Sequence, residues 1–303
     1  MEQPDLRLAA LRRFGTAITL LTLFGHGFLG FEQAPAHVVV ALATAYTLEL
    51  ATERLLARLQ QRPARYTGGW RKLVDFLLPG HITGLACAML LYTNERLWVL
   101  AFAVAVAVGS KSLLRVPVGR ATLHFLNPSN TGITTTLLLF PWVGIAPPYQ
   151  FTENIYGIAD WLLPLLFVLV GSFLNIRLTR RIVLILGWLG GYAVQALARQ
   201  ALFGTPLEAP LAPFTGVAFL LFTFYMVSDP ATTPQRPLQQ AAFGAAVALV
   251  YGALVMLHIV FAMFYALTIV CATRGLLLYL DSLKVRVPVP GEAPILARRQ
   301  EPL

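Results

Sequence analysis

Long apolar stretches alternate with short polar loops along almost the whole chain. Ten stretches approach the length of about 20 residues that a helix needs to cross the hydrocarbon core of a bilayer. The pattern therefore predicts an all-α integral membrane protein with ten transmembrane helices. The expected spans are Phe14–Phe31, Ala36–Ala57, Leu73–Thr93, Leu97–Leu114, Asn127–Ile145, Ile158–Leu178, Ile182–Leu202, Pro213–Val227, Leu238–Leu257 and Ile259–Leu280.

Two of these spans have weak boundaries. The eighth is short and begins beside Pro210 and Pro213, and the ninth and tenth are separated only around His258. Five spans in each half would give the halves opposite orientations, as in inverted-repeat transporters. The sequence itself shows no convincing internal repeat.

Basic residues provide a separate test of the topology. Of the 23 Lys and Arg residues, 20 lie before the first span, in the even-numbered loops or the span ends that adjoin them, or after the last span. Only Arg96 and Arg199 lie in odd-numbered loops, and Arg274 lies inside the tenth span. Because basic loops stay in the cytoplasm, we expect both termini on the cytoplasmic side of a bacterial inner membrane.

Composition supports the same class of protein. Charged residues make up 12% of the chain, about half of what a soluble domain carries. The net charge of +9 comes from the loops, which indicates contact of these loops with anionic lipid. We do not expect binding to nucleic acid. We expect one membrane domain over residues 1–283, without a cleavable signal, and a flexible, basic, Pro-rich tail over 284–303. Cys87 and Cys271 lie in apolar runs 184 positions apart, so both are expected to be small buried side chains.

Two helix breaks stand out among the cytoplasmic loops. Asn127-Pro128 opens the fifth span, where Asn is a good N-cap and Pro fits the first turn. Asp229-Pro230 follows the eighth span, and the residue before a proline is pushed out of the helical region. The predicted topology puts both breaks on one membrane face. Each is compatible with a plain helix end or with part of a binding site for a planar ligand.

The surrounding residues resemble one known family. The stretch FLNPSNTGITTTLLLFPW after the lead-in GSKSLL, the third-span entry DFLLPGHITG and the later MVSDPATTP are similar, in this order, to motifs of the RnfD/NqrB family. Members of this family are membrane components of Rnf complexes and of the sodium-pumping NADH:quinone reductase. The resemblance covers about residues 75–244, and it is strongest to short, solitary members associated with enediyne biosynthesis gene clusters.

The resemblance implies a membrane electron-transport subunit that contains flavin. The family's S/T-G-A-T attachment motif is absent between Phe140 and Asp229, so riboflavin or FMN held without a covalent bond is expected. His124 is a second departure, because redox members often have Asn there. Quinone, other electron-transfer subunits or a cytosolic reductase are the implied partners. The candidate cofactor-binding residues are Lys111, His124, Asn127, Pro128, Asn130, Thr131, Gly132, Ser228, Asp229, Pro230, Thr232 and Thr233.

Two other functions remain open at this point: a transporter of flavin or another small amphipathic metabolite, and a non-catalytic membrane scaffold. No catalytic or metal-binding residues are assigned. Five further ionisable side chains inside the spans are functional candidates by position alone; these are His26, Glu49, His81, His258 and Arg274. Glu49 and Glu53 are one helical turn apart and could bind a cation or a proton, or pair with the loop arginines. Arg274 could pair with one of these carboxylates or extend to the inner surface.

Overall fold

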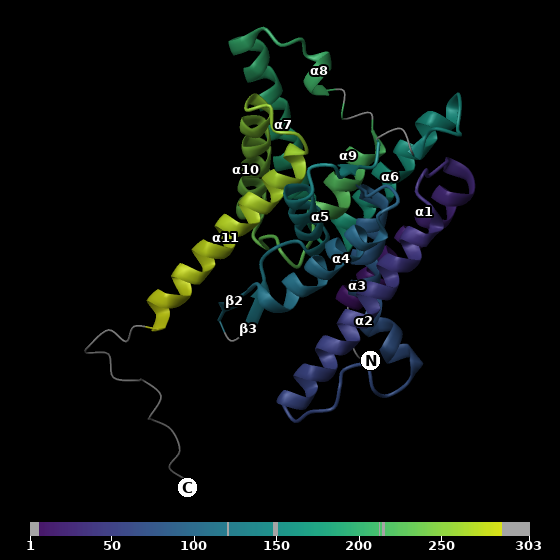
Figure 1. The fold of residues 1–303 in the computed structure, drawn as a ribbon. Coiled ribbons are helices and arrows are strands. Elements are labelled where there is room, and N and C mark those ends of the chain that lie inside the picture. The colour runs from purple at the N-terminus through teal and green to yellow at the C-terminus, as the bar shows by residue number, and fades with distance from the viewer. Residues whose placement is uncertain (1–5, 120, 148–150, 212, 214–215, 287–303) are drawn as a thin grey trace, which may run out of the picture.

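The computed structural model describes residues 6–286, apart from 120, 148–150, 212 and 214–215, and is almost entirely helical (Figure 1). In the first half, α1 (Leu6–Phe24) continues into a π-helical segment, η1 (Gly25–Leu29). The remaining helices of this half are α2 (Pro35–Leu59), α3 (Trp70–Leu90), α4 (Leu97–Leu113) and α5 (Pro128–Leu139).

The second half begins with α6 (Ile158–Arg177) and α7 (Ile182–Phe203). A short helix, α8 (Glu208–Leu211), precedes α9 (Val217–Leu221), which continues into a second π-helical segment, η4 (Phe222–Met226). The chain then forms α10 (Pro237–Met256) and α11 (Ala262–Arg286), whose C-terminal half extends away from the other helices in Figure 1.

Six helices of the described chain are long and apolar enough to cross a membrane. They correspond to the first, third, sixth, seventh, ninth and tenth expected spans, so the chain is an all-α protein of multi-pass membrane type. Of the other four, α2 is long but less apolar, and α4 is 17 residues long. The fifth and eighth expected spans are much shorter than predicted: α5 has 12 residues, and α9 and η4 have five each.

The exposed side chains agree with this class. On α6 the outward residues are large and apolar, with Trp161, Leu162, Leu166, Leu169 and Phe173 all more than half exposed. Polar side chains are buried instead, which is the reverse of a soluble protein. Cys87 and Cys271 are free and buried, as expected. The expected tail starts inside α11, and residues 287–303 lie outside the described part of the chain.

Glycines let the helices of each half approach closely. A side chain on Gly244 of α10 would collide with the backbone of α7 at Leu184 and Trp188, and one on Gly187 of α7 would meet the backbone of Ala241. In the first half Gly132 of α5 lies directly against Ala103 of α4. In lipid the hydrophobic effect does not drive helices together, so close packing at such small residues stabilises the helix pairs instead.

In the described part of the chain, two short antiparallel strand pairs join segments between the helices. β1 (Leu91–Tyr92) pairs with β4 (Gly144–Ile145), and β2 (Arg115–Val118) pairs with β3 (Ala121–His124). The β2–β3 hairpin brings the chain from the end of α4 to Asn127 and packs against α11, where Gly275 lies under the ring of Phe125. The hairpin therefore fixes where the first helix break lies.

Candidate functional site

Asn127 caps the N-terminus of α5, as the sequence predicts. Its backbone is extended, its Oδ1 accepts from the Asn130 N–H at 3.0 Å and from the Ser129 hydroxyl at 3.1 Å, and Pro128 occupies the first helical turn. Asn127 is only 6% exposed. The cap therefore satisfies a backbone donor that would otherwise be buried without a partner.

The same side chain connects the two helix breaks. Asn127 Nδ2 lies 3.2 Å from the Met226 carbonyl oxygen and 3.3 Å from Asp229 Oδ2. Met226 is the last residue of η4, so the N-terminus of one short helix meets the C-terminus of the other. We call this meeting point, formed by Asn127, residues 226–233 and the two arginines described below, the joint.

Asp229 organises the loop after η4. Its Oδ1 accepts from the Ala231 N–H at 3.0 Å, and its Oδ2 accepts from the Thr232 hydroxyl at 3.1 Å. The Thr233 hydroxyl donates to the Asp229 carbonyl at 2.5 Å, and Ser228 donates to the Phe224 carbonyl at 2.6 Å. Such local bonds from Asp, Ser and Thr are typical of a turn that replaces a helix end.

Two arginines complete the joint, and sequence reasoning placed neither of them there. Arg181, only 6% exposed, donates to the Thr233 hydroxyl at 2.9 Å and to the carbonyls of Thr179 and Pro230. Arg274 on α11 donates to the Thr232 carbonyl at 3.0 Å. Of the two alternatives for Arg274, pairing with Glu49 or Glu53 is not seen, because Arg274 donates to a loop carbonyl and these carboxylates pair with Lys111 and Arg62.

The joint has an excess of positive charge, since two guanidinium groups accompany one carboxylate. Burial lowers the pKa of Arg181, the Asp229 carboxylate opposes this shift and the charge of Arg274 adds to it. Arginine nevertheless stays protonated in proteins. The joint is therefore a largely buried polar cluster with net positive charge, and its chemistry suits an anionic or electron-rich partner.

The remaining α5 candidates are used for helix packing. Asn130 donates to the Phe264 carbonyl and to Thr268 on α11, and Thr131 donates to the Asn127 carbonyl. Gly132 permits the contact with α4. One atom, Asn130 Oδ1, is buried without a hydrogen-bond partner among the described residues.

Lys111 and His124 lie on other elements than the joint residues. Lys111 forms an ion pair with Glu49 of α2, and His124 is the last residue of β3, opposite Arg115 in the strand register. Glu53 pairs with Arg62 at 2.5 Å and lies 3.7 Å from Arg65, so the two carboxylates of α2 are neutralised separately. Lys111, expected among the cofactor-binding residues, thus connects α4 to α2.

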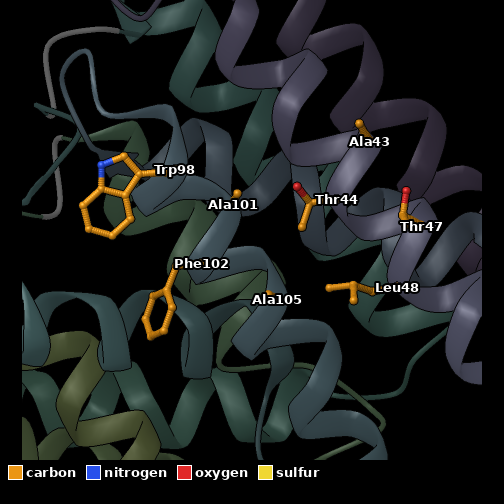
Figure 2. A pocket seen from close by; sticks show the side chains of 8 residues that line it. All are labelled: Ala43, Thr44, Thr47, Leu48, Trp98, Ala101, Phe102 and Ala105. Carbon is orange, nitrogen blue, oxygen red and sulfur yellow. The ribbon is translucent and has the colours of Figure 1, made fainter.

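One hollow that the structure outlines lies away from the joint. It is a groove of about 600 Å³ between α2 and α4, and Figure 2 shows Thr44 and Leu48 on one side of it and Trp98 and Phe102 on the other. Its lining is almost wholly apolar, which suits a lipid-facing surface. No group of three metal-ligating side chains occurs among the described residues.

These features define a multi-pass all-α membrane protein in which two short helices end at a buried, cationic polar joint. No model of a known protein family matches the chain, and no curated protein matches it significantly.

Proposed function

We propose that this chain is a membrane electron-transport subunit of the RnfD/NqrB kind. It holds riboflavin or FMN without a covalent bond against the joint and exchanges electrons with a quinone or a partner protein. The proposal rests on the ordered motifs and on one observation: Asn127 and Asp229, which come from separate motifs, lie 3.3 Å apart at the joint.

The geometry changes the expected role of Asn127. An amide offers two donor hydrogens and two acceptor lone pairs, and the protein already uses all four at Asn127. Asn127 therefore holds the joint together and is not free to bind the flavin's uracil-like edge. Arg274 suits that contact better, because only one of its five N–H donors has a partner among the described residues.

A bound flavin would supply the electron-transfer chemistry itself, as cofactors do. The chain's part is to orient the ring and to favour its charge. A planar guanidinium can donate two parallel bonds to carbonyl or phosphate oxygens, and an ammonium cannot. Arg181 keeps the Asp229 loop in place and adds positive potential, which favours an anionic reduced ring.

The absorbance spectrum of the purified chain tests this function. Protein from cells supplied with riboflavin should retain the blue-light absorbance band of oxidised flavin. Acid precipitation should release the flavin intact, because the bond is not covalent, and chromatography should identify it as riboflavin or FMN. A folded but colourless preparation would contradict the proposal and leave a scaffold role.

We also propose that the membrane domain has ten spans arranged as five plus five. Three helix contacts recur in corresponding places of the two halves: α1 packs on α3 and α6 on α9, α2 on α4 and α7 on α10, α4 on α5 and α10 on α11. The contacts of α3 with α2, α4 and α5 have no comparable counterpart at α9. The short α5 and α9–η4 do not occupy corresponding places in the two halves, so any repeat has diverged.

A transporter is the second candidate function, favoured by the short helices themselves. Helices that end inside a bundle often form substrate sites in transporters, because their free ends line a cavity. Uptake of labelled riboflavin into liposomes without an electron donor would favour transport. Retention of flavin without uptake would favour electron transfer.

A further inference from the structure

A line of polar residues follows α1 and faces α3. Arg12, Gly15, Thr19, Thr22 and His26 recur at intervals of three and four residues, which puts them on one helix face. Gly15 packs against Leu78 of α3, and α1 and α3 run side by side in Figure 1. We call these residues, together with Asp75 and His81 of α3, the α1–α3 seam.

The hydrogen bonds at the middle of the seam have a defined direction. Thr19 donates its only hydroxyl hydrogen to the Gly15 carbonyl at 2.7 Å, so Thr19 Oγ1 must accept from His81 Nε2, also 2.7 Å away. The neutral imidazole then accepts at Nδ1 from the Tyr46 hydroxyl of α2, at 2.6 Å. Three helices therefore form one ordered chain that runs from Tyr46 through His81 to Thr19.

Further polar residues of the seam lie on both sides of this chain. Toward the cytoplasmic end, Arg12 and Asp75 form two bonds of 2.7 and 2.8 Å. Toward the other end, His26 Nδ1 lies 2.9 Å from the Thr22 carbonyl, which can only accept. His26 Nε2 is therefore the acceptor nitrogen, and it is buried without a partner among the described residues.

Charged groups near His81 come from three of the four helices packed on α3, namely α1, α2 and α4. On α2, Glu49 lies against Gly80, the neighbour of His81, and pairs with Lys111 of α4. On α1 the nearest charges are Arg12, which pairs with Asp75, and the exposed Arg13. The helix α5 carries no titratable side chain. In the ion pairs Arg12–Asp75 and Glu49–Lys111 the charges neutralise each other. His81 is therefore the titratable group at the centre of the seam that has no charged partner among the described residues.

We propose that the α1–α3 seam conducts protons and that His81 is the residue that binds them. A proton from cytoplasmic water adds to His81 Nδ1, and the Tyr46 hydroxyl turns away. The protonated ring then rotates, and Nδ1 releases this same proton toward the hydroxyls of α1 and His26. The neutral ring keeps its Nε2 proton and rotates back, so one proton enters for each that leaves and no oxidant takes part. Chains of ionisable residues inside membrane helices commonly have this use.

Proteoliposomes that contain the full chain and a pH-sensitive dye test the proposal. A potassium diffusion potential should drive protons in faster than into protein-free liposomes. His81→Gln and Tyr46→Phe should slow this entry by about a hundredfold, at the low end of what positioned proton-transfer groups contribute. His258→Gln, at an exposed turn, is the matched control and should conduct as the wild type does.

The outcomes separate a relay from a structural contact. If the wild type conducts no faster than protein-free liposomes, or if His81→Gln conducts normally, the proposal is overturned. The same holds if the variants lower the unfolding temperature without changing the rate. Should His81→Gln fail to fold, Thr19→Val has nearly the shape of the native residue and should also slow proton entry. None of these results depends on flavin.

Discussion

The side chain of Asn127 connects the two helix breaks at the joint. Its oxygen caps α5 and its nitrogen bridges to η4 and to the Asp229 loop. These bonds are buried, so the groups they satisfy cannot turn to water instead. A lost partner therefore costs the desolvation of the group left behind as well as the bond.

Two substitutions of Asn127 distinguish its role as the cap of α5 from its bonds to η4 and the Asp229 loop. Asn127→Ala loses the cap and both bridging bonds, and should destabilise the protein by about 2–4 kcal/mol. Asn127→Ser keeps an oxygen for the cap and should cost about half as much. Thermal unfolding in detergent measures both, with the exposed Gln200→Ala as control. Equal losses for Ala and Ser would show that the cap contributes little.

The sequence predicts local chemistry at single residues better than their distant partners. The Asn127 cap and the Asp229 turn follow from neighbours within four positions, and both are confirmed. The places of Arg181 and Arg274 at the joint were not predicted. Arg181 lies in a loop, where arginine usually indicates membrane topology. Arg274 lies inside a span, where arginine usually has a carboxylate partner. Lys111 was assigned by motif order, but its partner Glu49 is 62 positions away.

At the level of helices, prolines explain the main differences from the predicted spans. The apolar run after Asn127 extends to Ile145, but α5 ends at Leu139 because Phe140 precedes Pro141 and cannot stay helical. A helix of 12 residues is about 18 Å long, well short of the roughly 30 Å hydrocarbon core. Hydropathy alone does not detect such a stop.

Glycine contacts between α7 and α10 give a sharp test of packing. Gly244→Ala would place a methyl group against the backbone of Leu184 and Trp188, and should destabilise the protein by about 1–3 kcal/mol or more. Gly190→Ala, also within this helix pair, meets nothing within 4 Å. It should be neutral or slightly stabilising, because alanine is the better helix former. Similar unfolding temperatures for the two variants would contradict the predicted packing.

For the whole molecule, the sequence predicts the class from composition and loop charge, because both are averages over many residues. The partner pattern of the two halves depends instead on which helix faces meet, and faces of uniformly apolar helices look alike in sequence. Sequence alone therefore does not decide whether the two halves are related by a repeat.

Cysteine labelling tests the ten-span topology. Asn94→Cys and Leu207→Cys lie in odd-numbered loops, and Gln61→Cys and Gln235→Cys lie in even-numbered ones. In intact cells a membrane-impermeant maleimide should label the first pair only, and it should label the second pair after permeabilisation. The buried Cys87 and Cys271 give little background. Labelling of either pair on the opposite side would exclude this topology.

The most direct test of flavin binding at the joint is a titration of riboflavin fluorescence with the purified chain. The wild type should quench the fluorescence saturably. Arg274→Gln should weaken binding by about tenfold, the equivalent of one lost hydrogen bond to a charged group. Arg96→Gln, whose guanidinium stacks on Trp142 5.1 Å away, should bind like the wild type. Equal affinities for Arg274→Gln and the wild type, or no saturable quenching, would contradict the account.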